Sequence, residues 1–156
     1  MLVDLARNDL GKKGRSVRVE KLMKVEYFSH VMHLVSRVSA QVSSDQNRYE
    51  LLADSFPAGT LSGAPKYKAM QLIDQYEPSR RGLYGGAIGF IGFDGSVNHA
   101  IFIRSAICKD SNVHYRAGAG IVVDSVPSLE RHEVVNKTDV IRHAMQMASQ
   151  TKTLVS

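Results

Sequence analysis

Two carboxylates near the end of the sequence occupy positions where a helix is expected to carry apolar residues. Residues 127–149, PSLERHEVVNKTDVIRHAMQMAS, have apolar residues at helical spacing and a proline suited to a first turn, so they predict one long helix. At about 100° per residue, Glu130, Glu133 and Lys137 fall on the apolar side of that helix. Carboxylates three residues apart repel each other unless a cation lies between them.

Two kinds of cation would resolve this repulsion. Lys137 follows Glu133 by four residues, which is the spacing of a helical ion pair. A divalent metal is the other solution, and oxygen-only ligands suit magnesium, which completes its shell with water and substrate. A third interpretation needs neither, because a helix that begins beyond the edge of the core would leave these residues in solvent.

A single arginine interrupts the apolar run AIFIRSAIC at residues 100–108. An Asp-Gly pair further back predicts a two-residue hairpin turn. This turn would place Gly85 opposite Arg104 and Tyr84 one position away. The glycines of the neighbouring segments are Gly85, Gly86, Gly89, Gly118 and Gly120. Glycine in a strand often marks close approach, so the pattern fits a small anion bound by Arg104, and equally an internal salt bridge in a coiled sheet.

The segment FPAGTLSGAPK, residues 56–66, has the composition of a loop that holds an anion against a helix start. Free amides and the helix dipole favour negative charge there. Ser62 is the expected N-cap, and Thr60 would present its hydroxyl beside it. A phosphate-binding P-loop is excluded, because Gly59 and Gly63 are one residue too close for GxxxxGK[ST] and no lysine directly follows the second glycine. An ordinary capped helix start would have the same composition.

The elements that must position these residues follow from the spacing of apolar residues. Strands are expected over residues 17–28, 30–42, 84–93, 96–108 and 113–123, with a turn at 109–112. A first helix is expected to end at Phe56, with Asp45 or Asn47 as its cap, and a second follows the 56–66 loop with an apolar stripe that ends at Tyr76. A third helix is expected over 127–149, and residues 2–10 fit a helix or a strand. This order predicts an α+β domain with an antiparallel meander.

Composition narrows the class of protein. The 156 residues suffice for one domain with a core. The net charge is +5, but the basic residues are scattered without the aromatic interleaving of nucleic-acid-binding proteins, so no nucleic-acid partner is expected. No apolar run approaches the ~18 residues of a membrane span, and no signal peptide is evident. The lone cysteine, Cys108, fits a reducing compartment, so a cytoplasmic location is expected.

Several motifs occur in an order and at a spacing that identify a family. They are MLVDLARNDLG, FPAGTLSGAPK, RGLYGG, IRSA, YRAGAGIVVDSVP and the E-x-x-E-x-x-x-K pattern from Glu130 to Lys137. From Met1 to about Ala148 they resemble the C-terminal part of the large subunit, component I, of anthranilate synthase, in the chorismate-utilising enzyme family. The resemblance implies the α+β fold of that family, with residues 1–150 as the C-terminal portion of the chorismate-binding catalytic domain and 151–156 as a tail.

The resemblance also implies a lyase reaction in tryptophan biosynthesis. Ammonia, released from glutamine by an amidotransferase subunit (component II), adds to the ring of chorismate, and pyruvate is then eliminated to leave anthranilate. Mg²⁺ binds the ring carboxylate. By match to the family motifs, Glu130 and Glu133 would bind the metal, His33 would act in the elimination, and Thr60 would be the active-site threonine of the loop. The residues that would bind substrate are Tyr84, Arg104, Gly118, Ala119, Gly120 and Lys137.

One departure from the family concerns length. The large subunit of the family is far longer, and a glutamate that supplies another magnesium contact, the tryptophan-sensing region and part of the substrate site all precede Met1. We therefore expect little or no catalysis by this chain alone, and self-association through exposed apolar surface. Within the family, the alternative is aminodeoxychorismate synthase of the folate pathway, whose loop tends towards FPGGSITGAPK. Outside it, the alternative is a non-catalytic basic module that binds nucleic acid or another protein.

Overall fold

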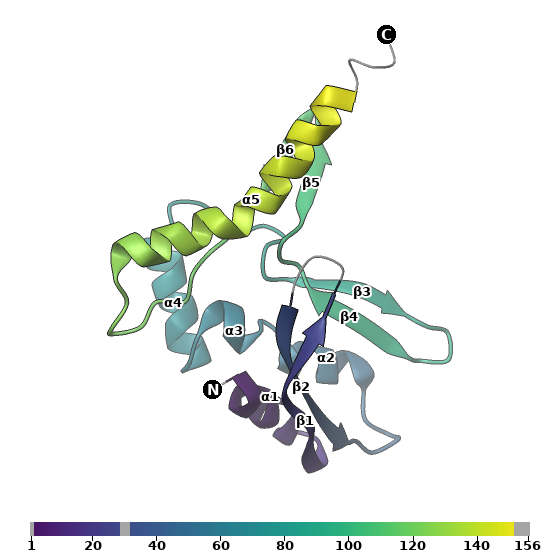
Figure 1. Ribbon diagram of the computed structural model, residues 1–156. Coiled ribbons are helices and arrows are strands. Elements are labelled where there is room, and N and C mark those ends of the chain that lie inside the picture. Colours follow the sequence, from purple (N-terminus) through teal and green to yellow (C-terminus); the bar gives the residue numbers. More distant parts are fainter. Residues whose placement is uncertain (1, 29–31, 152–156) are drawn as a thin grey trace.

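The structure is a computed structural model that describes residues 2–28 and 32–151. In order the elements are α1 Leu2–Gly11, β1 Arg15–Tyr27, β2 Met32–Gln41, α2 Arg48–Ser55, α3 Gly59–Ser62, α4 Lys66–Tyr76, β3 Ala87–Ile91, β4 Val97–Ile101, β5 Ala106–Lys109, β6 Asn112–Tyr115 and α5 Pro127–Thr151. The described chain forms three antiparallel hairpins, the first between α1 and α2 and the other two in succession between α4 and α5 (Figure 1). The predicted α+β class with antiparallel sheets is confirmed.

The longest hairpin joins β1 and β2, as the valine-rich alternation predicted. The expected start of its second strand at residue 30 lies outside the described residues. Residues 2–10, which fitted either a helix or a strand, lie in the helix α1, and α1 contacts both β1 and β2 (Figure 1). At Gly14, a Cβ would lie 2.6 Å from the carbonyl oxygen of Leu10 and 2.7 Å from Cβ of Ala40, so glycine is needed where the chain passes from α1 into β1.

Two helix predictions are confirmed. α2 begins after Asn47, whose Oδ1 accepts a hydrogen bond from the amide of Tyr49 at 2.9 Å, so Asn47 rather than Asp45 is the cap. The helix expected over 127–149 is α5, which extends to Thr151. Within the part of the chain that the structure describes, no helix combines the length and the hydropathy that crossing a bilayer requires.

The prediction that Ser62 caps the helix after the 56–66 loop is wrong. Ser62 is the last residue of the short helix α3, and its hydroxyl donates a hydrogen bond to the carbonyl oxygen of Ala58 at 3.0 Å. Gly63 follows with a φ of +127°, a conformation that side chains other than hydrogen rarely permit. This glycine ends α3, and α4 begins only after Pro65. The loop therefore forms a separate helical turn of its own.

The predicted three-stranded meander is instead two separate hairpins, β3–β4 and β5–β6. In the first hairpin Ile91 pairs with Val97, and the amide of Gly92 donates to the carbonyl oxygen of Ser96 at 2.7 Å. The loop thus spans residues 93–95, with Gly95 at a φ of +79° in the left-handed conformation that three-residue hairpin loops use. A two-residue turn was predicted here, so the observed register is shifted by one residue.

Arg104 does not lie in the middle of a sheet, and this prediction is also wrong. The expected strand 96–108 is interrupted between Ile101 and Ala106. Arg104 has a φ of +50°, a left-handed conformation that cannot continue a strand, and its side chain is exposed. The turn expected at 109–112 is confirmed, because it closes the β5–β6 hairpin.

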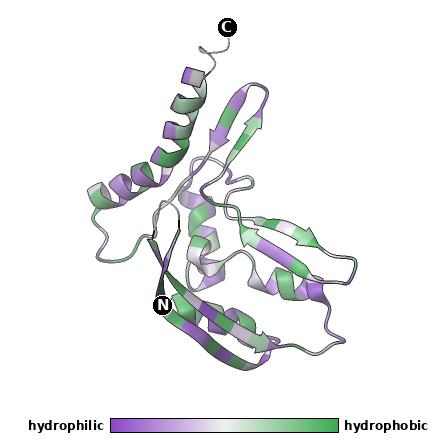
Figure 2. Ribbon diagram, turned by 45° about the vertical axis from the view of Figure 1, so that its right-hand side comes forward, coloured by the Kyte–Doolittle hydropathy of each residue, from purple (hydrophilic) through white to green (hydrophobic). Residues whose placement is uncertain are grey.

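In residues 2–28 and 32–150, apolar side chains are not gathered into a core. Among the described residues only Gly59 is buried, and no hydrophobic side chain is. Figure 2 shows hydrophobic residues distributed over the hairpins and helices. The accessible surface is 12,659 Å², whereas a compact protein of 17.2 kDa would expose about 7,800 Å². The apolar stripe predicted on α4 accordingly stays open, and Tyr76 at its end is 74% exposed. The expectation of a core is therefore wrong for the described residues.

Candidate functional site

The hydroxyl of Tyr84 lies against the backbone of Gly118. Tyr84 follows α4 in the connection to β3, and Gly118 lies in the connection from β6 to α5. A Cβ added to Gly118 would lie 3.2 Å from Oη of Tyr84, which is closer than most side chains approach. Gly118 therefore allows the phenol to come this near. Close approach at a glycine was predicted for this segment, and here the approaching group is a side chain of the same chain.

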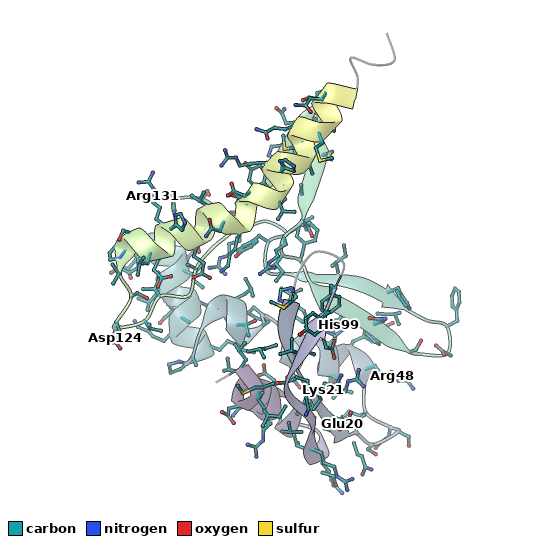
Figure 3. All side chains as sticks on the ribbon, in the orientation of Figure 1. Glu20, Lys21, Arg48, His99, Asp124 and Arg131 are labelled. Carbon is teal, nitrogen blue, oxygen red and sulfur yellow. The ribbon has the colours of Figure 1, made fainter. Side chains whose placement is uncertain are left out.

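Lys137 joins α5 to the same glycine. Its Nζ donates a hydrogen bond to the carbonyl oxygen of Gly118 at 2.9 Å and lies 2.5 Å from Oε1 of Glu133. Of the two cations considered for the carboxylates, the structure thus places the lysine beside Glu133. Tyr84, Gly118, Lys137 and Glu133 form a continuous set of contacts, which we call the Tyr84 cluster. Arg131, on the polar side of α5, and Asp124, on the preceding loop, both point outward (Figure 3).

Glu130 has a different partner. Its Oε1 accepts a hydrogen bond from Oγ of Ser125 at 2.7 Å, and that Oγ in turn accepts one from the amide of Val122 at 3.0 Å. These bonds fasten the start of α5 to the connection before it. Within the described ranges, no three His, Cys, Asp or Glu side chains come together as a ready metal site. The two glutamates nevertheless supply carboxylate oxygens one helical turn apart, which is a donor set that magnesium accepts when water and substrate complete its shell.

The short helix α3 lies beside Tyr84 and carries Thr60. The carbonyl oxygen of Leu61 accepts a hydrogen bond from Nη1 of Arg81 at 2.7 Å. A Cβ placed on Gly85 would be 3.7 Å from Cβ of Leu61, so these two residues are neighbours. Thr60 itself is exposed. The structure therefore brings the loop that carries Thr60 next to the Tyr84 cluster.

Two predicted site residues stand apart from this cluster. His33 is exposed on β2, where it pairs with Glu26 across the hairpin and its ring centroid is 5.9 Å from that of Phe28. Arg104 is exposed between β4 and β5. Among the residues that the structure describes, no hydrogen bond or ion pair links either side chain to the Tyr84 cluster. Their roles stay predictions.

A charged group that sequence reasoning missed lies next to Tyr84. The guanidinium carbon of Arg81 is 5.7 Å from the centroid of the Tyr84 ring, and Nη2 of Arg81 is 2.6 Å from Oε1 of Glu77. The hydrogen bond from Arg81 is the main cause that lowers the pKa of Glu77 from its ordinary value. These residues belong to EPSRRG, and Arg81 also opens the motif RGLYGG, but sequence reasoning assigned neither Glu77 nor Arg81 a role in the site. The adjacent arginines Arg80 and Arg81, directly before GLYGG, were the available signal.

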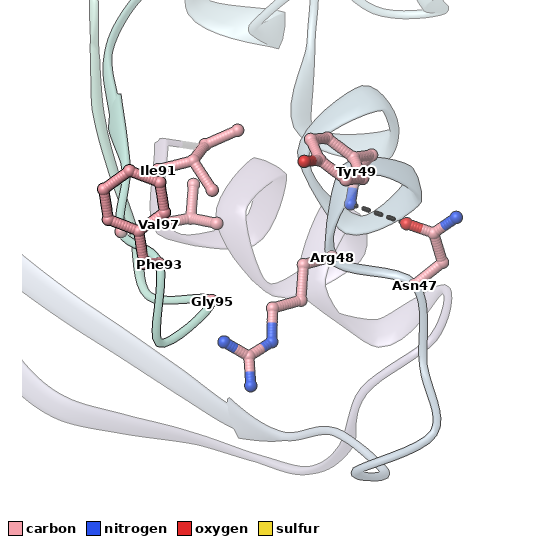
Figure 4. A pocket seen from close by; sticks show the side chains of 8 residues that line it. Asn47, Arg48, Tyr49, Ile91, Phe93, Gly95 and Val97 are labelled. Carbon is pink, nitrogen blue, oxygen red and sulfur yellow. Dashed lines mark hydrogen bonds between the residues drawn. The ribbon is translucent and has the colours of Figure 1, made fainter.

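A depression elsewhere on the molecule contains none of the predicted site residues. It is about 370 Å³ in volume and lies between the start of α2 and the β3–β4 hairpin (Figure 4). Its lining consists of Asn47, Arg48, Tyr49, Ile91, Gly92, Phe93, Gly95 and Val97. Nη1 of Arg48 donates a hydrogen bond to the carbonyl oxygen of Asp94 at 3.3 Å, which closes one side of it. The depression therefore shares no lining residue with the Tyr84 cluster.

Comparison with known proteins places the chain in a family. The sequence profile for chorismate binding enzymes matches residues 1–143. Anthranilate synthase component 1 of Aquifex aeolicus (strain VF5) is 48% identical over 154 residues, which are 97% of this chain and 31% of that protein. Anthranilate synthase component 1 of Geobacillus stearothermophilus is 51% identical over 150 residues, which are 95% of this chain and 30% of that protein. The chain spans about a third of the length of these relatives.

Solved structures agree with the sequence match. The crystal structure of anthranilate synthase component I from Streptococcus pneumoniae TIGR4 matches with a TM-score of 0.80 at 45% identity. The match covers 88% of this chain and 32% of the Streptococcus pneumoniae chain. A putative isochorismate synthase from Bacillus anthracis shares the fold, with a TM-score of 0.83 at 23% identity. This match covers 93% of this chain and 39% of the Bacillus anthracis chain. The predicted fold is confirmed. The chain belongs to the chorismate binding enzyme family.

Proposed function

We propose that this chain forms the C-terminal part of the chorismate site of an anthranilate synthase component I. The complete protein would convert chorismate and ammonia to anthranilate and pyruvate in tryptophan biosynthesis. The Tyr84 cluster carries this proposal, because it joins a phenol, a glycine backbone, a cation and a carboxylate from three separate segments. The names of the relatives described above favour anthranilate over aminodeoxychorismate as the product.

The two carboxylates of chorismate need cationic and amide donors. The exposed guanidinium of Arg104 can bind one carboxylate through two parallel hydrogen bonds. The segment Gly118, Ala119 and Gly120 lies outside the strands and would offer its backbone amides. A Cβ at Gly120 would meet nothing within 4 Å, so a ligand can approach the backbone there. Lys137 adds positive charge beside this segment.

Magnesium is the cofactor that we propose for Glu130 and Glu133. Each carboxylate has a second oxygen besides the one that contacts Ser125 or Lys137. One or two carboxylates with substrate and water oxygens are the usual magnesium shell in proteins. When bound, the ion would neutralise and orient the ring carboxylate of chorismate. Lys137 would hold Glu133 in position for this role.

We propose His33 as the general acid or base of the reaction, and Thr60 as a residue whose hydroxyl lines the site. The addition of ammonia and the loss of pyruvate both require protons to move, and histidine can donate and accept protons near neutral pH. Both side chains are exposed and so can be reached by a substrate. We also propose that a glutamine amidotransferase subunit supplies the ammonia and that the enzyme works in the cytoplasm. These two proposals rest on the relatives and on the reducing environment that Cys108 fits.

The test compares the isolated chain with a complete component I chain whose C-terminal third is this sequence. With chorismate, Mg²⁺ and ammonium, the complete chain is expected to form fluorescent anthranilate, and the isolated chain little or none. In the complete chain, Glu133→Ala should raise the magnesium concentration needed for half-maximal activity. Asp139→Asn, which changes an exposed carboxylate of the same helix, should not.

Three outcomes would contradict the proposal in different ways. Strong fluorescence from the isolated chain would refute its dependence on the rest of the domain. Equal magnesium activation with and without Glu133 would refute the metal role. Chromatographic identification of aminodeoxychorismate as the product of the complete chain would assign the folate-pathway reaction instead.

A further inference from the structure

Arg81 contacts two of the segments that carry proposed site residues. Its Nη1 donates to the carbonyl oxygen of Leu61 at 2.7 Å, next to Thr60. Its guanidinium lies 5.7 Å from the centre of the Tyr84 ring, within the range of a cation–π contact. A planar guanidinium can serve both neighbours at once, because its donors point in fixed directions, whereas a lysine ammonium is a single point of charge.

Glu77 fixes the orientation of that guanidinium. Both of its oxygens accept from Nε of Arg81, at 3.0 and 3.1 Å, and Oε1 also accepts from Nη2 at 2.6 Å. The two side chains are 26% and 29% exposed, so they are half-buried on this open molecule. The hydrogen bond from Arg81 lowers the pKa of Glu77, so this carboxylate stays charged to a lower pH than a free glutamate does.

Arg116 ties a third segment to the same carboxylate. Its Nη2 lies 3.3 Å from Oε2 of Glu77, and its Nη1 donates to the carbonyl oxygen of Arg80 at 2.6 Å. A further bond runs from Nη2 to the carbonyl oxygen of Ser79 at 3.1 Å. Arg116 stands two residues before Gly118, so it anchors the segment that meets Tyr84 and Lys137.

We propose that Glu77, acting through Arg81 and Arg116, is the positioning residue that sets Tyr84 and the 118–120 backbone against each other. Glu77 lies at the point where the α3 loop, the Tyr84 connection and the 116–120 segment meet. It need not touch the substrate itself. This inference rests on the proposed function only in that the positioned groups are the ones proposed to bind chorismate.

The first measurement needs no catalysis. In this chain with 3-fluorotyrosine at all tyrosines, Tyr84→Phe identifies the ¹⁹F resonance of Tyr84. Arg81→Lys and Glu77→Gln are expected to shift and broaden that resonance, because the ring loses its oriented guanidinium. Asp139→Asn, in an exposed ion pair with Arg142, serves as the control and should leave it unchanged. An unchanged Tyr84 resonance in either Glu77→Gln or Arg81→Lys would overturn the proposal.

The second measurement uses a double-mutant cycle in the complete component I chain. Arg81→Lys should lower kcat/KM for chorismate by about 100-fold, the scale of a small misplacement of a catalytic group. Because Arg81 acts partly through Tyr84, the loss in Arg81→Lys/Tyr84→Phe should be smaller than the product of the two single losses. Losses that multiply in full would overturn the inference. A wild-type complete chain that makes no product would sink the proposed function, while the ¹⁹F result would still decide the positioning role.

Discussion

The open surface of this chain predicts self-association. Its accessible surface exceeds that of a compact protein of equal mass by about 4,900 Å². Permanent interfaces bury about 2,000–5,000 Å² summed over both partners, so the excess on one chain alone is enough for such an interface. Large apolar side chains contribute to it, and Phe93 and Val123 are fully exposed. We expect the isolated chain to form oligomers and to bind the apolar dye ANS.

The perturbation that tests the cause is the double variant Phe93→Ser/Val123→Ser. Burying an apolar side chain of this size is worth about 1.5–3 kcal/mol, so losing either contact should weaken association by roughly 10- to 100-fold, and losing both should weaken it further. Arg131→Ser is the matched control, because it removes an exposed polar side chain that points outward (Figure 3). Sedimentation velocity and light scattering over a dilution series give the dissociation constants. A monomer across the series without ANS fluorescence would refute the reasoning, as would equal weakening by the control.

Three further predictions concern individual contacts. Lys137→Met should lower the free energy of unfolding in urea by about 1 kcal/mol, because the charge-assisted hydrogen bond to the Gly118 carbonyl is lost. Glu133→Gln removes only a half-exposed ion pair with Lys137 and should lower it by about 0.3 kcal/mol. Equal effects of the two variants would contradict this assignment. Glu77 should titrate below the range of a free glutamate in carboxyl ¹³C NMR, because the hydrogen bond from Arg81 lowers its pKa. Since the pKa is lowered on folding, the stabilising effect of Glu77 is present above the unfolded pKa and disappears as pH falls through the folded pKa, and an ordinary titration would refute its pairing. Gly89→Ala should disrupt the β3–β4 hairpin, because the added Cβ would collide with the carbonyl oxygen of Asn98 in the paired strand. Amide hydrogen exchange in β3 and β4 should therefore become faster. Unchanged exchange would show that the strands can separate at little cost.

Long regular elements were predictable from the sequence because many residues contribute to each. The β1–β2 hairpin and α5 have periodic patterns over ten or more residues, and the side chain of Asn47 caps α2 by a bond within its own turn. The β3–β4 loop was not predictable to the residue, because an Asp-Gly pair serves both two-residue and three-residue turns. Choosing the latter shifts every later pair by one.

Arg104 and Arg81 show why the site was only partly predictable. Arg104 itself has a left-handed backbone conformation, which interrupts the predicted strand, and no pattern in AIFIRSAIC predicts that conformation. Arg81 lies in a charged helix end, which on its own indicates solvent. Its proposed role also depends on a contact with Leu61, which is twenty residues away in the sequence, so the fold and not the local sequence brings the two together. Glu133 and Lys137 were found because helical spacing already brings them together.

The two glycines of the 116–120 segment can now be distinguished. Neither Gly118 nor Gly120 has a left-handed φ, so backbone conformation does not require glycine at either position. Gly118 is explained within the chain, because its missing side chain makes room for the hydroxyl of Tyr84. A Cβ at Gly120 would have no described atom within 4 Å, so contacts inside the described chain do not explain this glycine. Under the proposed function, a substrate carboxylate that reaches the backbone amides at Gly120 would explain this glycine.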